Sequence, residues 1–289
     1  MNKLPIEKRV QILSMLCEGS SMRAISRVVG VSINTVTKLL VDAGNACASF
    51  HAETVRGLKI KRVQCDEIWS FCYKKQSNTT GPESKLGRGD IWTWTALDAD
   101  SKLIISWLVG DRDAEAASIF ISDVKDRLAT RVQLTTDGHR PYLDAVEEAF
   151  GGDVDYAMLV KLYGEDRSVP RGSQERRYSP SQVIGTRIDR ICGAPNAHYT
   201  STSFAERQNL TMRMSMRRFT RLTNAFSKKL DNHCHALALY FVWYNFVRTH
   251  KAHKLSPAMA AGLTDKLWDM ADIVRLVDEY EADKKRRAA

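Results

Sequence analysis

Hydrophobic residues recur at helical spacing through the first part of the chain. Polar and small residues separate these runs, and Gly30 stands where a tight turn is needed. The spacing predicts three short helices: residues 6–16, residues 22–29, and a third that has Ser32 as its N-cap and runs through Leu40. Short helices joined by a glycine turn are typical of a helix-turn-helix. We therefore predict such a module in residues 1–45 and a linker in residues 46–60.

The pattern changes after residue 60, where short apolar stretches are separated by turn-forming residues. Three stretches joined by short turns predict an antiparallel meander, with strands at residues 61–73, 90–98 and 102–109. Helical and strand-like stretches then alternate, with helices at residues 113–128 and 141–150 and strands at residues 131–136 and 155–162. This order predicts an α/β fold, in which helices flank a mixed sheet.

The last part of the chain returns to helical spacing after a polar segment. Residues 164–203 are rich in Arg, Ser, Pro and Gly and are predicted to be an insertion, apart from a strand-like piece at residues 182–191. Three further helices are predicted, at residues 204–222, 231–247 and 265–280. We expect one core domain over residues 61–250 and a helical tail over residues 251–289.

The net charge of +9 is distributed unevenly along the 289 residues. Residues 1–62 carry a net charge of +6, residues 63–205 carry −4, and residues 206–289 carry +7. Basic flanks around an acidic centre suit a polyanion held from both sides, because each neutralised phosphate releases counterions. The acidic centre would then require metal ions.

Neither the cysteines nor the apolar runs indicate a disulfide framework, a zinc ribbon or a membrane span. None of the six cysteines forms a Cys-x-x-Cys pair, and the longest apolar stretch, residues 236–247, is shorter than the roughly 20 residues that a span needs. On a helix His233 and His235 would point about 200° apart, so they are a poor ligand set with Cys234. We expect a soluble cytoplasmic protein with reduced thiols.

Three acidic residues stand in settings that metal-dependent nucleases use. Asp66 lies on the first predicted strand, Asp137 ends the fourth, and Glu206 opens a helix. Carboxylates from separate elements can converge to hold two divalent ions about 3.5 to 4 Å apart for phosphoryl transfer. We therefore predict a site for two Mg²⁺ ions, with Mn²⁺ as a substitute. Strand alternation places Glu67 on the face opposite Asp66, which predicts that Glu67 is not a ligand.

Basic residues follow the third acid and also mark the third predicted helix. Glu206 is followed at helical spacing, with no intervening acid, by Arg213, Arg217 and Arg221. This stripe would lay phosphates across the acidic site, although a solvated cationic helix face explains the same pattern. Near the N-terminus, contacts with bases or phosphates are predicted for three outward-facing side chains, Asn34, Thr35 and Lys38. A three-helix packing module is the alternative there.

Four stretches of the chain resemble the DDE transposases of bacterial insertion sequences, which share a ribonuclease H-like core with retroviral integrases. The matching stretches are CDEIWSF at 65–71, TTDGHRPY at 135–142, ERQNLTMRMSMRRFTRLTNAFSK at 206–228 and YNFVRTHKAHKLSPAMAAGL at 244–263. With the N-terminal helices, the resemblance covers nearly the whole chain. It implies that Asp66, Asp137 and Glu206 are the catalytic triad and that Arg213 is the basic residue that often follows the glutamate.

The interval between the second and third acids departs from the family pattern. Asp137 and Glu206 are 69 residues apart, roughly double the interval of integrases, and the predicted insertion at residues 164–203 accounts for the difference. Some relatives carry a zinc-binding element before the helix-turn-helix, whereas this chain has no cysteine or histidine set there. The subfamily is therefore left open.

The resemblance implies a transposase that acts at the bacterial nucleoid. It would bind double-stranded DNA at the terminal inverted repeats of its element and at the target, and would cleave and join strands at one Mg²⁺-dependent site. Because two element ends must be joined together, we expect a homo-oligomer on DNA. The alternatives are a non-catalytic DNA-binding regulator, a nuclease of the same fold that hydrolyses DNA without joining it, and an inactive relic of a mobile element.

Overall fold

The computed structural model describes residues 3–84, 86–164, 183–220 and 223–288. Its strands are β1 (Arg62–Cys72), β2 (Gly89–Asp98), β3 (Ile104–Gly110), β4 (Gln133–Asp137), β5 (Asp155–Tyr163) and β6 (Val183–Cys192). Its α-helices are α1 (Ile6–Cys17), α2 (Met22–Val29), α3 (Ile33–Thr54), α4 (Gly81–Ser84), α5 (Ala114–Arg127), α6 (Pro141–Phe150), α8 (Ser203–Ser215), α9 (Leu230–Val242), α10 (Pro257–Ala260) and α11 (Met270–Ala288). Short 3-10 turns lie at Gln76–Asn78, Ala197–Tyr199 and Arg217–Phe219, and a π-helical turn follows α9 at Trp243–Val247.

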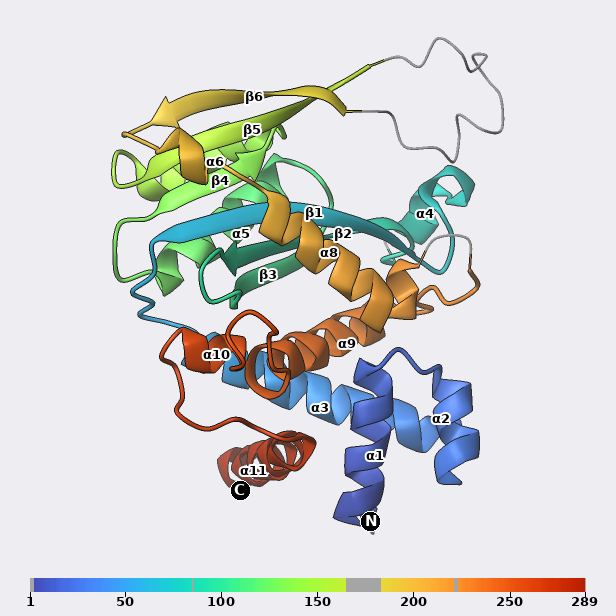
Figure 1. Cartoon of the computed structure of the whole chain (residues 1–289). Coiled ribbons are helices and arrows are strands. Elements are labelled where there is room, and N and C mark those ends of the chain that lie inside the picture. The colour runs from blue at the N-terminus through green and yellow to red at the C-terminus, as the bar shows by residue number, and fades with distance from the viewer. Residues whose placement is uncertain (1–2, 85, 165–182, 221–222, 289) are drawn as a thin grey trace.

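The strands form one mixed six-stranded sheet in the order β3-β2-β1-β4-β5-β6 (Figure 1). β4 pairs in parallel with both β1 and β5, whereas the other neighbouring pairs are antiparallel. The strand-like piece predicted at residues 182–191 is therefore an edge strand of the sheet, while residues 165–182 of the predicted insertion lie outside the described residues. The predicted α/β fold is confirmed, and this arrangement is consistent with the ribonuclease H-like core that the resemblance implies.

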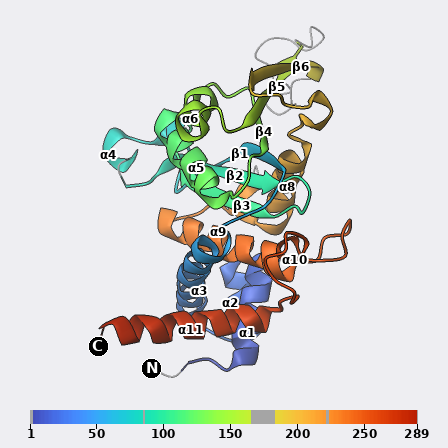
Figure 2. The ribbon, with the colours of Figure 1, turned by 90° about the vertical axis from the view of Figure 1, so that its left-hand side faces the viewer.

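Helices cover both faces of the sheet, with α5 and α6 on one face and α8 on the other (Figure 2). Beneath α5 and α6 lies Trp94, which is fully buried. Its ring centroid is 5.8 Å from that of Phe120 and 5.4 Å from that of Tyr142. Burial of such large aromatic side chains provides a substantial hydrophobic driving force for packing this helix layer on the sheet.

The first helices follow the predicted helix-turn-helix order. Gly30, at φ +69°, takes the left-handed conformation that ends α2, and the hydroxyl of Ser32 accepts from the backbone N–H of Thr35 to begin α3. The chain bends by 113° between α2 and α3, while the helix-turn-helix assignment itself stays a prediction. No single helix in the described part of the chain is long and apolar enough to cross a membrane, and only the bent pair of α2 and α3 passes the same length and composition test.

Helix α3 extends well into the predicted linker and connects the N-terminal helices to the sheet layer. It packs along α9, which lies between α3 and the sheet (Figure 1). A Cβ atom at Gly44 would lie 2.4 Å from the Cβ of His235 on α9, so glycine permits this close crossing. At the far end of α3, the guanidinium of Arg127 donates to the carbonyl groups of His51 and Val55 at 3.3 and 3.1 Å. A cation there complements the dipole of the helix.

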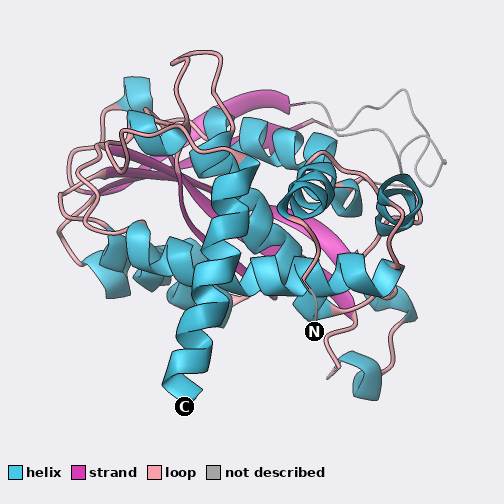
Figure 3. Ribbon diagram, turned by 90° about the horizontal axis from the view of Figure 1, so that it is seen from below, coloured by secondary structure: helices cyan, strands magenta, loops and turns pink. Residues whose placement is uncertain are grey.

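The C-terminal helix α11 packs against α1 and α3, and its C-terminal end projects from the rest of the molecule in the view from below (Figure 3). Arg9 of α1 donates through both Nη atoms to Asp278 of α11 at 2.7 and 3.0 Å. The helix begins later than the predicted residue 265, because Asp269 and Asp272 form a reciprocal cap. The N–H of Asp272 donates to Asp269 at 3.0 Å, and the N–H of Asp269 donates to Asp272 at 2.9 Å.

Candidate metal-binding active site

The sheet opens where β1 and β4 diverge. Their parallel pairing ends at Gln64 and Thr135, although β1 continues to Cys72 and β4 to Asp137. In open α/β sheets, ligands bind in crevices at the carboxyl ends of the strands. Asp66 on β1 and Asp137 on β4 each lie two residues beyond the last paired residues, Gln64 and Thr135. Both carboxylates therefore face the crevice.

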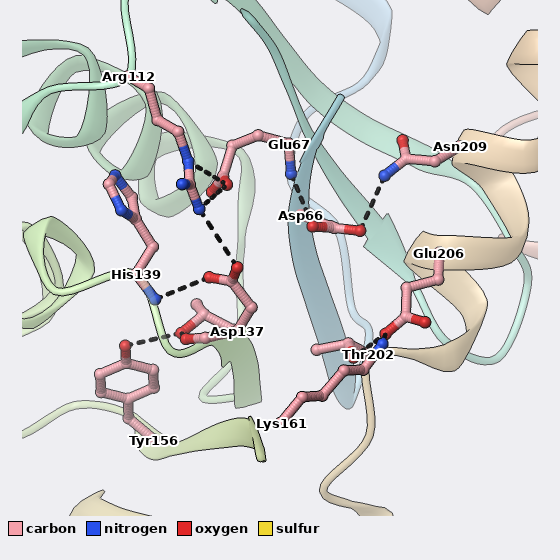
Figure 4. A network of polar contacts seen from close by, with 11 residues as sticks. Asp66, Glu67, Arg112, Asp137, His139, Tyr156, Lys161, Thr202, Glu206 and Asn209 are labelled. Atoms are coloured by element: carbon pink, nitrogen blue, oxygen red, sulfur yellow. Dashed lines mark hydrogen bonds and ion pairs between the residues drawn. The ribbon is translucent and has the colours of Figure 1, made fainter. Parts of the chain in front are cut away.

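A cleft with a volume of about 790 Å³ lies at this divergence. Its lining includes Asp66, Asp137 and Glu206, and also Arg213. Figure 4 shows Asp66 between the other two carboxylates. All three predicted acids thus line one cleft, while their role as a catalytic and metal-binding triad stays a prediction.

Asp66 is held by two hydrogen bonds and is difficult to ionise. Its Oδ1 accepts from the backbone N–H of Glu67 at 2.9 Å, and its Oδ2 accepts from the side-chain amide of Asn209 on α8 at 2.8 Å. Burial, followed by the nearby charge of Asp137, raises the pKa of Asp66 to about 7. Asn209 lies one helical turn after Glu206, so i, i+3 spacing was the sequence signal that could have identified it.

Glu67, which strand alternation predicts to be no ligand, also lines this cleft. Its side chain is 1% exposed, and Oε1 has no hydrogen-bond partner among the described residues. The hydroxyl of Tyr142 lies close to the Glu67 carboxyl group but forms no hydrogen bond with it. Burial, with a contribution from Asp137, raises the pKa of Glu67 to about 8. Strand alternation holds, since Asp66 bonds to Asn209 of α8 and Glu67 lies beside Tyr142 of α6 on the other face. Both side chains still line the cleft, because β4 no longer pairs with β1 at this point.

Arg112, just after β3, connects Glu67 to Asp137. Its guanidinium donates to Glu67 at 3.2 Å and to Asp137 at 3.4 Å, and it lies 4.9 Å from the ring centroid of Trp92. Asp137 also accepts from the backbone N–H of His139 at 2.9 Å. Arg112 therefore partly neutralises two carboxylates at once, as Figure 4 illustrates.

Glu206 is positioned by the start of α8. The buried Gln64 of β1 accepts from the backbone N–H groups of Phe204 and Ala205, which fixes this helix end against the strand. The Glu206 carboxylate accepts from the hydroxyl of Thr202 at 2.5 Å and forms an ion pair with Lys161 of β5 at 2.6 Å. Burial lowers the pKa of Lys161, but the hydrogen bond and charge of Glu206 have the larger combined effect, so the pKa of Lys161 is raised.

The predicted helix over residues 204–222 is wrong at its end, so Arg213 and Arg217 do not share one helix face, while their contact with DNA stays a prediction. α8 ends at Ser215 instead of residue 222, and Met216 leaves the helix with φ −128° and ψ 97°. The turn after α1 packs against this end, because a Cβ atom at Gly19 would lie 2.9 Å from the carbonyl oxygen of Ser215. Arg217 therefore lies beyond the break and lines a separate pocket beside Gly19. Arg221 lies outside the described residues.

The three predicted DNA-contacting side chains lie on the first turns of α3. Asn34 is exposed, Thr35 is partly buried, and the side chain of Lys38 is 52% exposed and paired with Asp42. Thr35 and Lys38 also line a pocket with Glu281 of α11. Their contact with DNA stays a prediction.

The oxygen donors in the cleft suit a hard divalent cation. The ligand oxygens of Asp66, Glu67 and Asp137 lie within 4.8 Å of one another, and carboxylate oxygens are the donors that Mg²⁺ and Mn²⁺ prefer. Within the described ranges no other group of three such side chains has this spacing, so Glu206 lines the cleft but lies outside the group. The buried Oε1 of Glu67 has no hydrogen-bond partner among the described residues, which fits a carboxylate that would bind a cation.

Comparison with protein-family models and with curated proteins finds no match. Among solved structures, the chain is similar to a piggyBac transposase synaptic complex with hairpin DNA, at 9% identity over 98% of this chain and 72% of that chain, with a TM-score of 0.37. It is similar to the Mos1 strand transfer complex at 11% identity over 97% of this chain and 78% of that chain, with a TM-score of 0.32. It is also similar to a pre-cleavage Mos1 transpososome at 11% identity over 54% of this chain and 60% of that chain, with a TM-score of 0.22. Similarities of this size establish neither a family nor an activity.

Proposed function

We propose that the chain is a DDE transposase of a bacterial insertion sequence, which cleaves and joins DNA strands at the acidic cleft. The observation that carries the proposal is the convergence of Asp66, Asp137 and Glu206 on one cleft at the diverging ends of β1 and β4. Acids from two strands and a helix are the arrangement that phosphoryl transfer with divalent ions requires. The basic flanks of the chain suit a DNA partner.

In this proposal the three carboxylates hold two Mg²⁺ ions, which Mn²⁺ can replace. Bound cations would supply Lewis-acid stabilisation of the charge that develops on the phosphate. Lys161 and Arg213 line the cleft and bind phosphate groups of the DNA strand through their charge. Hydrolysis releases a 3′-hydroxyl at the element end, and that hydroxyl then attacks a target phosphodiester, so that one P–O bond forms as another breaks.

The start of α3 supplies the recognition surface in the same proposal. Asn34, Thr35 and Lys38 contact the terminal inverted repeat from the second helix of a helix-turn-helix, the usual place for base readout. Two element ends require two copies of the chain, so the active form is a homo-oligomer on DNA.

The test uses plasmid DNA that carries the sequences flanking the gene. Wild-type chain with Mg²⁺ is expected to nick this DNA at the element ends and to join the released ends to a target. Asp66→Asn, Asp137→Asn and Glu206→Gln are each expected to lower the cleavage rate by more than about 100-fold while keeping end binding. Asp126→Asn, at an exposed position on α5, is the matched control and should retain both.

Each alternative has its own outcome in this assay. Cleavage retained by one of the three variants removes that residue from the triad. Specific end binding without Mg²⁺-dependent cleavage favours the non-catalytic regulator. Cleavage without joining favours the hydrolytic nuclease.

A further inference from the structure

Glu67 occupies an unusual position for a residue next to a candidate metal ligand. On a continuous sheet its carboxylate would be separated from that of Asp66 by the strand itself. Here the pairing with β4 has already ended at Gln64 and Thr135, so no neighbouring strand closes that side of β1. The ligand oxygens of Asp66, Glu67 and Asp137 consequently lie within 4.8 Å of one another.

The Glu67 carboxylate is buried, and only one of its oxygens is engaged. Oε2 accepts from Arg112 at 3.2 Å, whereas Oε1 has no hydrogen-bond partner in the part of the chain that the structure describes. Leaving such an atom unsatisfied is costly, because a buried acceptor has lost water without replacement. Because one carboxylate oxygen of Glu67 lies within 4.8 Å of ligand oxygens of Asp66 and Asp137, a cation bound by these two residues would lie within reach of the Glu67 carboxylate.

We propose that Glu67 is a further carboxylate ligand of the cation site, together with Asp66 and Asp137, while Glu206 serves a second cation position with Asp66. This inference rests on the proposed function, because it assumes that the cleft binds divalent cations. Arg112 then competes with the cation, since its guanidinium already binds Glu67 and Asp137. Cation binding displaces the guanidinium from these two carboxylates.

A purely structural role for Glu67 makes the opposite prediction for Arg112. If Glu67 only anchored Arg112, which in turn held Asp137 in place, then removing either partner would disturb Asp137 equally. If Glu67 is a ligand and Arg112 a competitor, the two substitutions change cation affinity in opposite directions. The sign of the Arg112 effect therefore separates the two roles.

The experiment is calorimetric titration of the full chain with MnCl₂ in the absence of DNA. Glu67→Gln keeps the shape of the side chain and is expected to weaken Mn²⁺ binding about tenfold or more, because ligand charge sets the affinity of such sites. Arg112→Gln is expected to bind Mn²⁺ at least as tightly as wild type. Asp66→Asn should bind it far more weakly, and Glu148→Gln, an exposed position on α6, should match wild type.

Equal Mn²⁺ affinity of Glu67→Gln and wild type overturns the inference, and so does weakening by Arg112→Gln to the same extent. Should Glu67→Gln fail to fold, Glu67→Asp keeps the charge but withdraws the carboxylate by one methylene group, and the same weakening is expected. The proposed function fails separately: in that case wild type binds no Mn²⁺, or Asp66→Asn binds it as wild type does.

Discussion

Replacing Asp66 with asparagine should stabilise the chain at alkaline pH when cations are absent. The pKa of Asp66 rises from 3.8 to about 7 on folding. Because the folded state holds this proton more tightly than the unfolded state, the associated stability is fully present below about pH 4 and is lost as pH rises through about 7. At pH 8 the wild-type chain must therefore keep an unfavourable charge that the asparagine variant lacks.

The magnitude follows from that pKa difference and from one hydrogen bond. At about 1.36 kcal/mol per pKa unit, ionising Asp66 costs the folded state about 4 kcal/mol at most. The asparagine side chain has an NH2 group in place of one of the two carboxylate oxygens that accept from Glu67 and Asn209, so one of these bonds is lost at a cost of about 1 kcal/mol. Solvent in the open cleft reduces the first value further. A net gain of about 2 kcal/mol is expected at pH 8.

Urea unfolding with EDTA at pH 8 and pH 5 measures this difference. At pH 5 Asp66 is protonated in the folded state but largely ionised in the unfolded state, so wild type still loses about 1.6 kcal/mol. This loss roughly offsets the lost hydrogen bond, and the variant should lie within about 1 kcal/mol of wild type. Asp126→Asn, at an exposed position, should differ little from wild type at either pH. A variant that is less stable than wild type at both pH values would refute the conclusion that ionised Asp66 destabilises the folded state.

Three further outcomes are expected. Mn²⁺ at a hundredfold excess over its dissociation constant should raise the free energy of unfolding by about 2.7 kcal/mol in wild type and much less in Asp66→Asn, measured by urea titration. Gly44→Ala should lower the free energy of unfolding by about 1 to 2 kcal/mol despite the better helix propensity of alanine, because the added Cβ would lie 2.4 Å from the Cβ of His235. Asn45→Ala, at an exposed position on the same helix, is the control. An equal gain in stability in both variants would contradict the close packing of α3 on α9. Asn34→Ala should weaken binding to the element ends by about 1 to 3 kcal/mol in a mobility-shift titration and relax sequence preference, whereas Lys38→Ala should weaken binding to all sequences alike and lower its salt dependence.

The local pattern of residues predicts elements that depend on their own sequence. Residues 141–150 were predicted as a helix, and α6 spans Pro141–Phe150. Helix ends decided by distant contacts were not predictable in this way. α3 continues because α9 covers one side of it, and α8 stops where the turn at Gly19 packs against Ser215. Neither partner lies near in sequence.

The sequence likewise predicts the acids of the cleft better than their partners. Strand ends and a helix start were enough to select Asp66, Asp137 and Glu206, which share the cleft. Arg112 and Lys161 carry no local signal, since strand register alone brings them to the acids. Glu67 was rejected by a rule that assumes an unbroken sheet, and the divergence of β1 from β4 removes that assumption.

The length of helix α3 fixes the distance between its two ends. Its 22 residues form a rod about 33 Å long, with the predicted reading side chains at one end and the anchor by Arg127 at the other. This length is close to one turn of B-form DNA, about 34 Å. Under the proposed function, the length of this helix would set the distance between the sequence that is read and the bond that is cut.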